Sequence, residues 1–202
     1  GPVFRGRRAP DEQRSEFLAS KDNWFRPVQA MTGPDGALWV VDMYRFVIEH
    51  PRWIPKERLA KLDPRAGSDM GRIYRIYPRG KRLINHSDLS SLSSADLAKK
   101  LNTGNGVLRD AIHQELVSRK DRSATKPLEQ LARDSKIPQA RMQALCTLDG
   151  LRSLTDEALA RALSDPHPGV RKQAVRLSEP RLADKPILAT KMTQMTDDPD
   201  PA

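Results

Sequence analysis

The chain has 202 residues, which is enough for one or two domains with a buried core, and 30% of them are charged. The longest apolar run, Ala37–Val41, is far shorter than the roughly 20 residues that a membrane-spanning helix needs. The single cysteine, Cys146, excludes an internal disulfide, a Cys-x-x-Cys metal site and a c-type haem attachment site. We expect no transmembrane segment, and the lack of an initiator Met at Gly1 predicts a fragment or a mature product.

The net charge of +9 is unevenly distributed. Residues 1–82 contain 17 Lys and Arg against 10 Asp and Glu, whereas residues 83–202 contain 18 against 16. A basic surface can attract nucleic acid, anionic lipid or an anionic cofactor. No run of Lys and Arg is longer than two, so we expect no nucleic-acid partner.

Residues 1–82 contain every Trp, Tyr and Phe of the chain, which favours strands. The patterns predict strands at Arg26–Met31, Ala37–Asp42 and Gly71–Tyr77, with weaker strands at Glu16–Ala19 and Val3–Arg7. Gly33-Pro34-Asp35-Gly36 predicts the hairpin between the first two. Such a sheet is too small to bury both of its faces. We therefore expect one propeller blade with a partly exposed apolar face.

A long insertion, Met43–Met70, separates the second strand from the third. Its three prolines argue against continuous regular structure, and an insertion of this length in a compact domain is usually functional. Asp42, Glu49 and His50 lie at its start and are weak candidates for a metal site. Hydrogen bonding within the loop is the simpler interpretation of all three, because no ligand spacing demands a metal.

Residues 83–195 are rich in Leu and Ala and predict short helices. Ser93 and Asp96 form a capping box, Thr155 is a helix cap, and Pro138 and Pro168 fit the first turns of helices. The Asp- and Pro-rich residues 196–202 predict a disordered tail.

The helices recur at a fixed spacing. Arg109, Arg141 and Arg171 begin equivalent helices, with a partner helix between each two. Helix pairs that can bury their apolar stripes only by stacking predict an α-solenoid. The fold class expected is therefore an α+β chain in two parts, with strands over 1–82 and helical repeats over 83–195.

Two parts of the sequence resemble known families. The segment Asp165-Pro166-His167-Pro168-Gly169-Val170-Arg171 resembles HEAT repeats, in which such an Arg commonly pairs with an Asp of the next repeat. The stretch Phe17–Pro78, through Trp24–Val28, Gly33–Arg45, Val47–Pro51 and Gly71–Ile76, is similar to the last propeller blade of the membrane-bound dehydrogenases of planctomycete-type bacteria. Those propellers are related to glucose and sorbosone dehydrogenases and are followed by HEAT-like repeats.

This resemblance implies an oxidoreductase that oxidises a sugar or polyol, with pyrroloquinoline quinone (PQQ) and calcium bound in the parent protein. It also implies a periplasmic or cell-envelope location. Arg26 matches an Arg that faces the cofactor, where a guanidinium can hold a carboxylate. The alternative for Arg26 is packing on Trp24 or an ion pair between blades. The catalytic base and most calcium ligands of such enzymes lie in earlier blades, so this chain alone is not expected to be catalytic.

Two functions remain open. The chain is either the closing part of such a dehydrogenase, with the repeats as a scaffold, or a non-catalytic propeller–solenoid module that binds a protein. The expected partners are the remainder of the propeller and, on the repeats, a protein or an electron acceptor. A nucleic-acid-binding solenoid would instead require Arg109, Arg141 and Arg171 to line one exposed groove.

Overall fold

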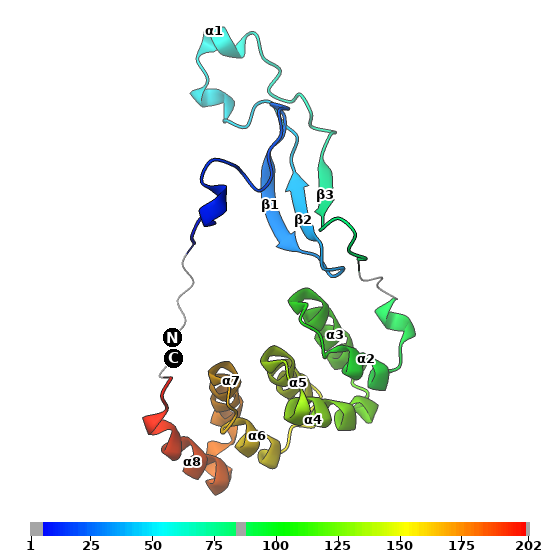
Figure 1. Ribbon diagram of the computed structural model, residues 1–202, viewed down its shortest axis with the longest axis vertical. Helices are drawn as coiled ribbons and strands as arrows, with labels where there is room; N and C mark the ends of the chain where they lie inside the picture. Colours follow the sequence, from blue (N-terminus) through cyan, green and yellow to red (C-terminus); the bar gives the residue numbers. More distant parts are fainter. Residues whose placement is uncertain (1–5, 84–87, 201–202) are drawn as a thin grey trace. The chain divides into compact units, whose positions relative to one another are not determined.

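A computed structural model describes residues 6–83 and 88–200 (Figure 1). The chain separates into two compact units, which divide between the described residues Leu83 and Asp88. The first unit contains a small antiparallel sheet and the second is helical, so the mixed α+β class is confirmed. The boundary lies at the change in composition near residue 82. No helix within the described ranges is long and apolar enough to cross a membrane.

The sheet has three strands in the order β1 (Pro27–Thr32), β2 (Leu38–Asp42) and β3 (Arg72–Ile76), all antiparallel to their neighbours. All three lie within one residue of the predicted main strands. The predicted hairpin also forms. Gly36 takes a φ of 81°, which the missing Cβ permits, and its N–H donates to the carbonyl of Gly33 at 3.0 Å.

The predicted strand at Glu16–Ala19 is wrong, because this segment is irregular and exposed. A strand needs a pairing partner for its backbone groups. The described sheet consists of β1, β2 and β3, and none of them pairs with the backbone of Glu16–Ala19. The one ion pair described in this segment is on the surface, between the Arg8 guanidinium and the Glu16 carboxylate. The predicted strand at Val3–Arg7 lies mostly outside the described residues, and its described part, residues 6–7, is irregular.

The sheet unit buries few apolar side chains of its own. Ala37, Val40 and Val47 are its buried hydrophobic residues within the described chain, whereas every residue of β1 is exposed. Met31 and Ile73, which project from the same face of the sheet, are 46% and 60% exposed. The predicted exposed apolar face is therefore present. Burial of apolar area is the main favourable term in folding, and this unit obtains little of it from its own residues.

The helical unit consists of short helices that begin where the sequence predicts. Ser93 accepts a hydrogen bond from the N–H of Asp96, Thr155 accepts one from Ala158, and Pro138 and Pro168 open their helices. The helices are α2 (Ser94–Lys100), α3 (Gly106–Arg119), α4 (Thr125–Asp134), α5 (Pro138–Gly150), α6 (Asp156–Ala162), α7 (Pro168–Ser178) and α8 (Pro186–Thr193).

These helices form two layers (Figure 1). Helices α3, α5 and α7 contact one another in sequence and make one layer, while α2, α4, α6 and α8 make the other. The layers meet at a single buried cluster of side chains. Its fully buried large members include Leu97, Ile112, Leu116, Leu128, Leu145, Leu148, Leu159 and Leu188.

The described part of the predicted disordered tail is held by contacts. Residues Gln194–Asp197 form a 3-10 helix, and both carboxylate oxygens of Asp198 accept hydrogen bonds from Arg171. Asp198-Pro199 repeats the Asp165-Pro166 that begins the preceding helix pair, and Asp165 pairs in the same way with Arg141. The composition that suggested disorder thus provides a specific ion pair. Residues 201–202 lie outside the described ranges.

The Arg141–Asp165 pair predicts a pH dependence for the helical unit. Burial alone would raise the pKa of Asp165, but hydrogen bonds from Arg141 and from the His167 N–H outweigh it and lower the pKa below the usual 3.8. A lowered folded pKa contributes stability above pH 3.8, and this stability is lost as the pH falls through the folded value. Thermal unfolding followed by helical circular dichroism should give a higher unfolding midpoint for the wild type than for Asp165→Asn at neutral pH. The difference between the two midpoints should narrow below about pH 4. A constant difference would contradict this.

Candidate carboxylate-binding site

The end of β2 fixes the backbone of Arg26. One oxygen of the buried Asp42 carboxylate, Oδ1, accepts hydrogen bonds from the N–H groups of Arg26 (2.8 Å) and Tyr44 (2.9 Å). The N–H of Met43 in turn donates to the carbonyl of Arg26. Asp42 is 1% exposed, so this carboxylate is an internal brace that joins the start of β1 to the start of the insertion.

Aromatic rings support the same corner. Trp24 packs against Tyr44 and Phe46, with ring centroids 5.6 Å and 5.9 Å away. The Arg72 guanidinium lies 3.6 Å from the centroid of the Tyr44 ring, a distance typical of a cation–π contact. Gly67 is required here, because a Cβ at this position would lie 2.5 Å from the carbonyl of Tyr44.

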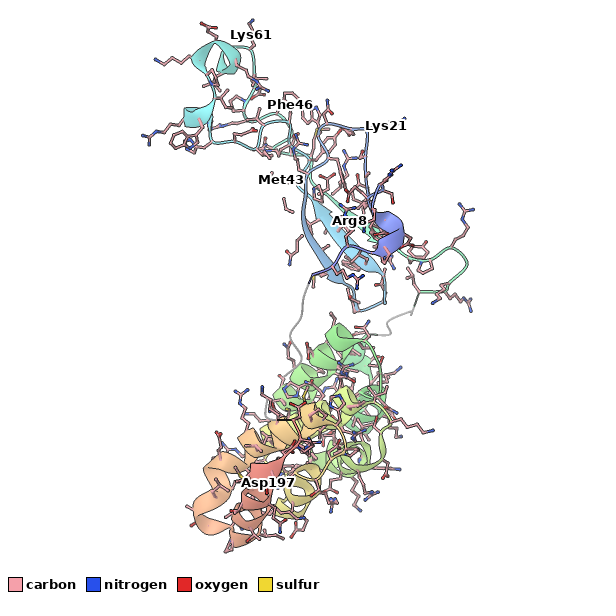
Figure 2. The ribbon with its side chains drawn as sticks, turned by 60° about the vertical axis from the view of Figure 1, so that its left-hand side comes forward. Arg8, Lys21, Met43, Phe46, Lys61 and Asp197 are labelled. Carbon is pink, nitrogen blue, oxygen red and sulfur yellow. The ribbon has the colours of Figure 1, made fainter. Side chains whose placement is uncertain are left out.

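The insertion closes a pocket of about 380 Å³ over Arg26. The insertion contains a 3-10 helix (Pro51–Trp53) and the short helix α1 (Lys56–Leu59). Figure 2 labels two residues of the insertion, Phe46 and Lys61. The pocket has an aromatic and aliphatic wall with two guanidinium groups and one carboxylate. Its lining residues are Asn23, Arg26, Phe46, Val47, Glu49, Trp53, Ile54, Pro55, Arg58 and Leu62.

Arg26 has an unused hydrogen-bond donor in this pocket. Its Nη1 donates to the carbonyl of Phe25 at 3.0 Å, but its buried Nε has no hydrogen-bond partner among the residues that the structure describes. A buried donor without an acceptor is unfavourable and rare in folded proteins. The Nε is therefore available to an acceptor, and a guanidinium is best matched by an anionic oxygen.

Glu49 is the one acidic side chain that lines the pocket. Hydrogen bonds from its own N–H and that of Ile48 lower its pKa, with a smaller contribution from the positive charges of Arg58 and Arg26. Glu49 is therefore ionised at neutral pH. With two arginines and one glutamate, the pocket keeps an excess of positive charge that favours an anionic ligand.

The three weak metal candidates do not come together. Asp42 binds backbone N–H groups, Glu49 lines the pocket, and His50 Nδ1 accepts the N–H of Arg52 at 3.2 Å and so caps a 3-10 helix. No group of three or more His, Cys, Asp or Glu within the described residues could hold a metal ion.

The structure places Arg26, the residue that the sequence named as a candidate, in one pocket with Arg58 and Asn23, which the sequence did not indicate. Arg58 lies on α1, and only the path of the insertion brings it to the pocket. The one available signal was the length of the insertion, which predicts a functional loop without indicating which residues act.

Comparison with known families gives one match. Residues 1–80 match a family model described as "Domain of unknown function (DUF7133)". No curated protein and no solved structure matches the chain. The match covers the sheet unit, including Arg26 and the insertion, and assigns it no activity. The resemblance to membrane-bound dehydrogenases thus stays a prediction.

Proposed function

We propose that this chain is the closing part of a quinone-dependent sugar or polyol dehydrogenase of the cell envelope. In this proposal the sheet is the terminal blade of a β-propeller, and the Arg26 pocket holds a carboxylate of PQQ. The helices form a HEAT-like solenoid that serves as a scaffold. The observation that carries the proposal is the unpartnered, buried Nε of Arg26 in a pocket of net positive charge.

The residues of the pocket fit the quinone in part. PQQ carries several carboxylates on a flat ring system, and the pocket offers two guanidinium groups, the amide of Asn23 and the rings of Phe46 and Trp53. When bound, the quinone accepts the electrons of the alcohol, while this chain holds and orients it. The pocket offers one carboxylate, Glu49, which is too few for a calcium site of six or more oxygens. Calcium would therefore bind elsewhere in the parent.

The sheet unit supports the same proposal. Its exposed β1 and its apolar residues Met31 and Ile73 would be covered by neighbouring sheets in a propeller. An exposed apolar face of this kind favours an assembly over a free-standing domain. The helical repeats support a scaffolding role, because stacked helix pairs present long surfaces to partners.

The test is calorimetric titration of PQQ with calcium into the full-length form of the protein. Replacing Arg26 by Ala should weaken binding at least about tenfold, because one charge-assisted hydrogen bond contributes about 1.5–3 kcal/mol. Arg79→Ala removes the same charge from an exposed position outside the pocket and should leave binding unchanged. Absence of binding to the wild type would reject the quinone and favour the second candidate, a non-catalytic propeller–solenoid module whose exposed apolar residues contact a protein.

A further inference from the structure

Two arginines of the helical unit bind the next helix pair with the same set of atoms. Arg141 donates from Nη1 to the carbonyl of Ser135, and from Nε and Nη2 to Asp165 at 2.7 Å and 2.6 Å. Arg171 donates from Nη1 to the carbonyl of Asp165, and from Nε and Nη2 to Asp198 at 2.6 Å and 2.5 Å. In both, Nη1 binds a carbonyl six residues earlier, and Nε binds a carboxylate of the following pair.

Arg109 makes the contact with the earlier carbonyl but not the contact with a carboxylate of the following pair. Its Nη1 donates to the carbonyl of Thr103, again six residues earlier, at 2.7 Å. Its Nε is buried and, within residues 6–83 and 88–200, has no hydrogen-bond partner. This is the atom that binds the carboxylate in the other two arginines.

The missing acceptor traces to a single residue. Six residues before Arg171 is Asp165, and six residues before Arg141 is Ser135. Ser135 keeps the local role of Asp165, because its Oγ accepts the N–H of Ile137 as Asp165 accepts that of His167. Its hydroxyl donates to the side chain of Asn102 at 2.7 Å. By the repeat spacing, this neutral hydroxyl stands in the place relative to Arg109 that the Asp165 carboxylate takes relative to Arg141.

The pockets at the two junctions differ in volume and in charge. Asp165 lines a pocket of about 180 Å³ between α4 and α6, while Ser135 lines one of about 410 Å³ between α2 and α4. The larger pocket contains Lys126 and Lys99, of which Lys99 also pairs with Asp96 at 3.0 Å, beside Asn102 and Gln130. Its one acidic side chain, Asp134, is paired with Arg133. The junction without the internal carboxylate is therefore both wider and more basic.

We propose that the junction between α2 and α4 is a carboxylate-binding site. A carboxylate from outside the helical unit takes the position that Asp165 and Asp198 occupy at the other junctions and accepts the Nε–H of Arg109. Lys126, with Lys99 beside its Asp96 pair, attracts it and balances its charge. The carboxylate belongs either to an acidic side chain of a partner protein or to a free small acid. This site is in the helical unit, so it stands independently of the quinone proposal.

Nuclear magnetic resonance of the arginine Nε–H groups tests this directly. Two probes distinguish the sources: succinate represents a free acid, and a blocked Gly-Asp-Gly peptide represents an acidic side chain. Either probe should shift the Nε–H signal of Arg109 in a saturable manner. The Nε–H signal of Arg171, which is already paired with Asp198, is the internal control and should stay in place.

Variants at Ser135 supply the matched comparison. Ser135→Asp should fill the site from within, shift the Arg109 signal without a probe, raise the unfolding midpoint, and weaken probe binding at least about tenfold. Ser135→Asn introduces a side chain of the same size as in Ser135→Asp, and its oxygen can still accept the N–H of Ile137, but it carries no charge. This variant should still bind the probe. Arg109→Lys removes the Nε–H and should abolish binding, read from the backbone amides of Thr103 and Ser135.

Some outcomes would overturn the proposal. One is the absence of any saturable shift with both probes, which would mean that water satisfies Arg109. Another is an equal shift with sodium chloride at the same ionic strength. A third is probe binding that Ser135→Asp leaves unchanged. Saturation by the peptide alone would support an acidic partner protein, and saturation by succinate alone would support a free acid.

Discussion

Replacing Arg141 by Ala should lower the free energy of unfolding of the helical unit by about 3 kcal/mol. The Arg141 and Asp165 side chains are 10% and 9% exposed, and Arg141 also satisfies the carbonyl of Ser135. Removing one partner of a buried pair leaves the other charge in a poorly solvated place. The Asp165 carboxylate would keep the N–H of His167 as its one remaining donor among the bonds described. Urea unfolding followed by circular dichroism at 222 nm measures the change.

The control for this variant is Arg133→Ala. Arg133 also pairs with an aspartate, Asp134, but both side chains are more than half exposed. Solvent and salt screen such a pair, and it should contribute nothing measurable. Equal losses in the two variants would mean that Arg141 contributes through its general charge and not through the buried junction between helix pairs.

Replacing Asp42 by Ala should lower the free energy of unfolding of the sheet unit by about 3 kcal/mol. The substitution leaves the N–H groups of Arg26 and Tyr44 without their acceptor. Each unsatisfied buried donor costs about 1–3 kcal/mol. Tyr44 adds strain, because it holds a φ of 51° that non-glycine residues rarely adopt. The Asp42 carboxylate is also 3.8 Å from Arg72, so its loss removes an ion pair as well.

Tryptophan fluorescence isolates this effect. All three Trp residues lie in the sheet unit, so their emission during urea unfolding reports that unit alone. Asp63→Ala is the matched control, because Asp63 also accepts a backbone N–H, that of Arg65, but on an exposed loop. An Asp42→Ala midpoint that equals the Asp63→Ala midpoint would show that the Asp42 brace does not stabilise the unit.

The Asp42 variant also bears on the candidate site. Asp42 does not line the Arg26 pocket, but it holds the backbone from which Arg26 projects. Asp42→Asn keeps an oxygen that can accept the same two N–H groups. We expect it to retain most of the sheet unit's stability and the binding of any carboxylate ligand at Arg26.

The sequence by itself determined the three strands of the sheet, the helices of the second unit and the division into two units. Ser93, Thr155, Pro138 and Pro168 mark helix starts because a cap or a fixed φ acts within three residues of its own position. The Gly33–Gly36 hairpin is local in the same sense. Arg26 was identified as a candidate from its place before the hairpin, by resemblance.

Only the tertiary structure decided which groups are left without partners. The strand expected at Glu16–Ala19 is absent because none of the described strands pairs with that segment, and the described part of the tail, expected to be disordered, holds the Asp198–Arg171 pair. Arg58 meets Arg26 in one pocket through the path of a long insertion. The physical reason is common to all of these. Hydrogen-bond satisfaction depends on residues that folding brings together from distant positions, and no local pattern records whether a given donor finds its acceptor.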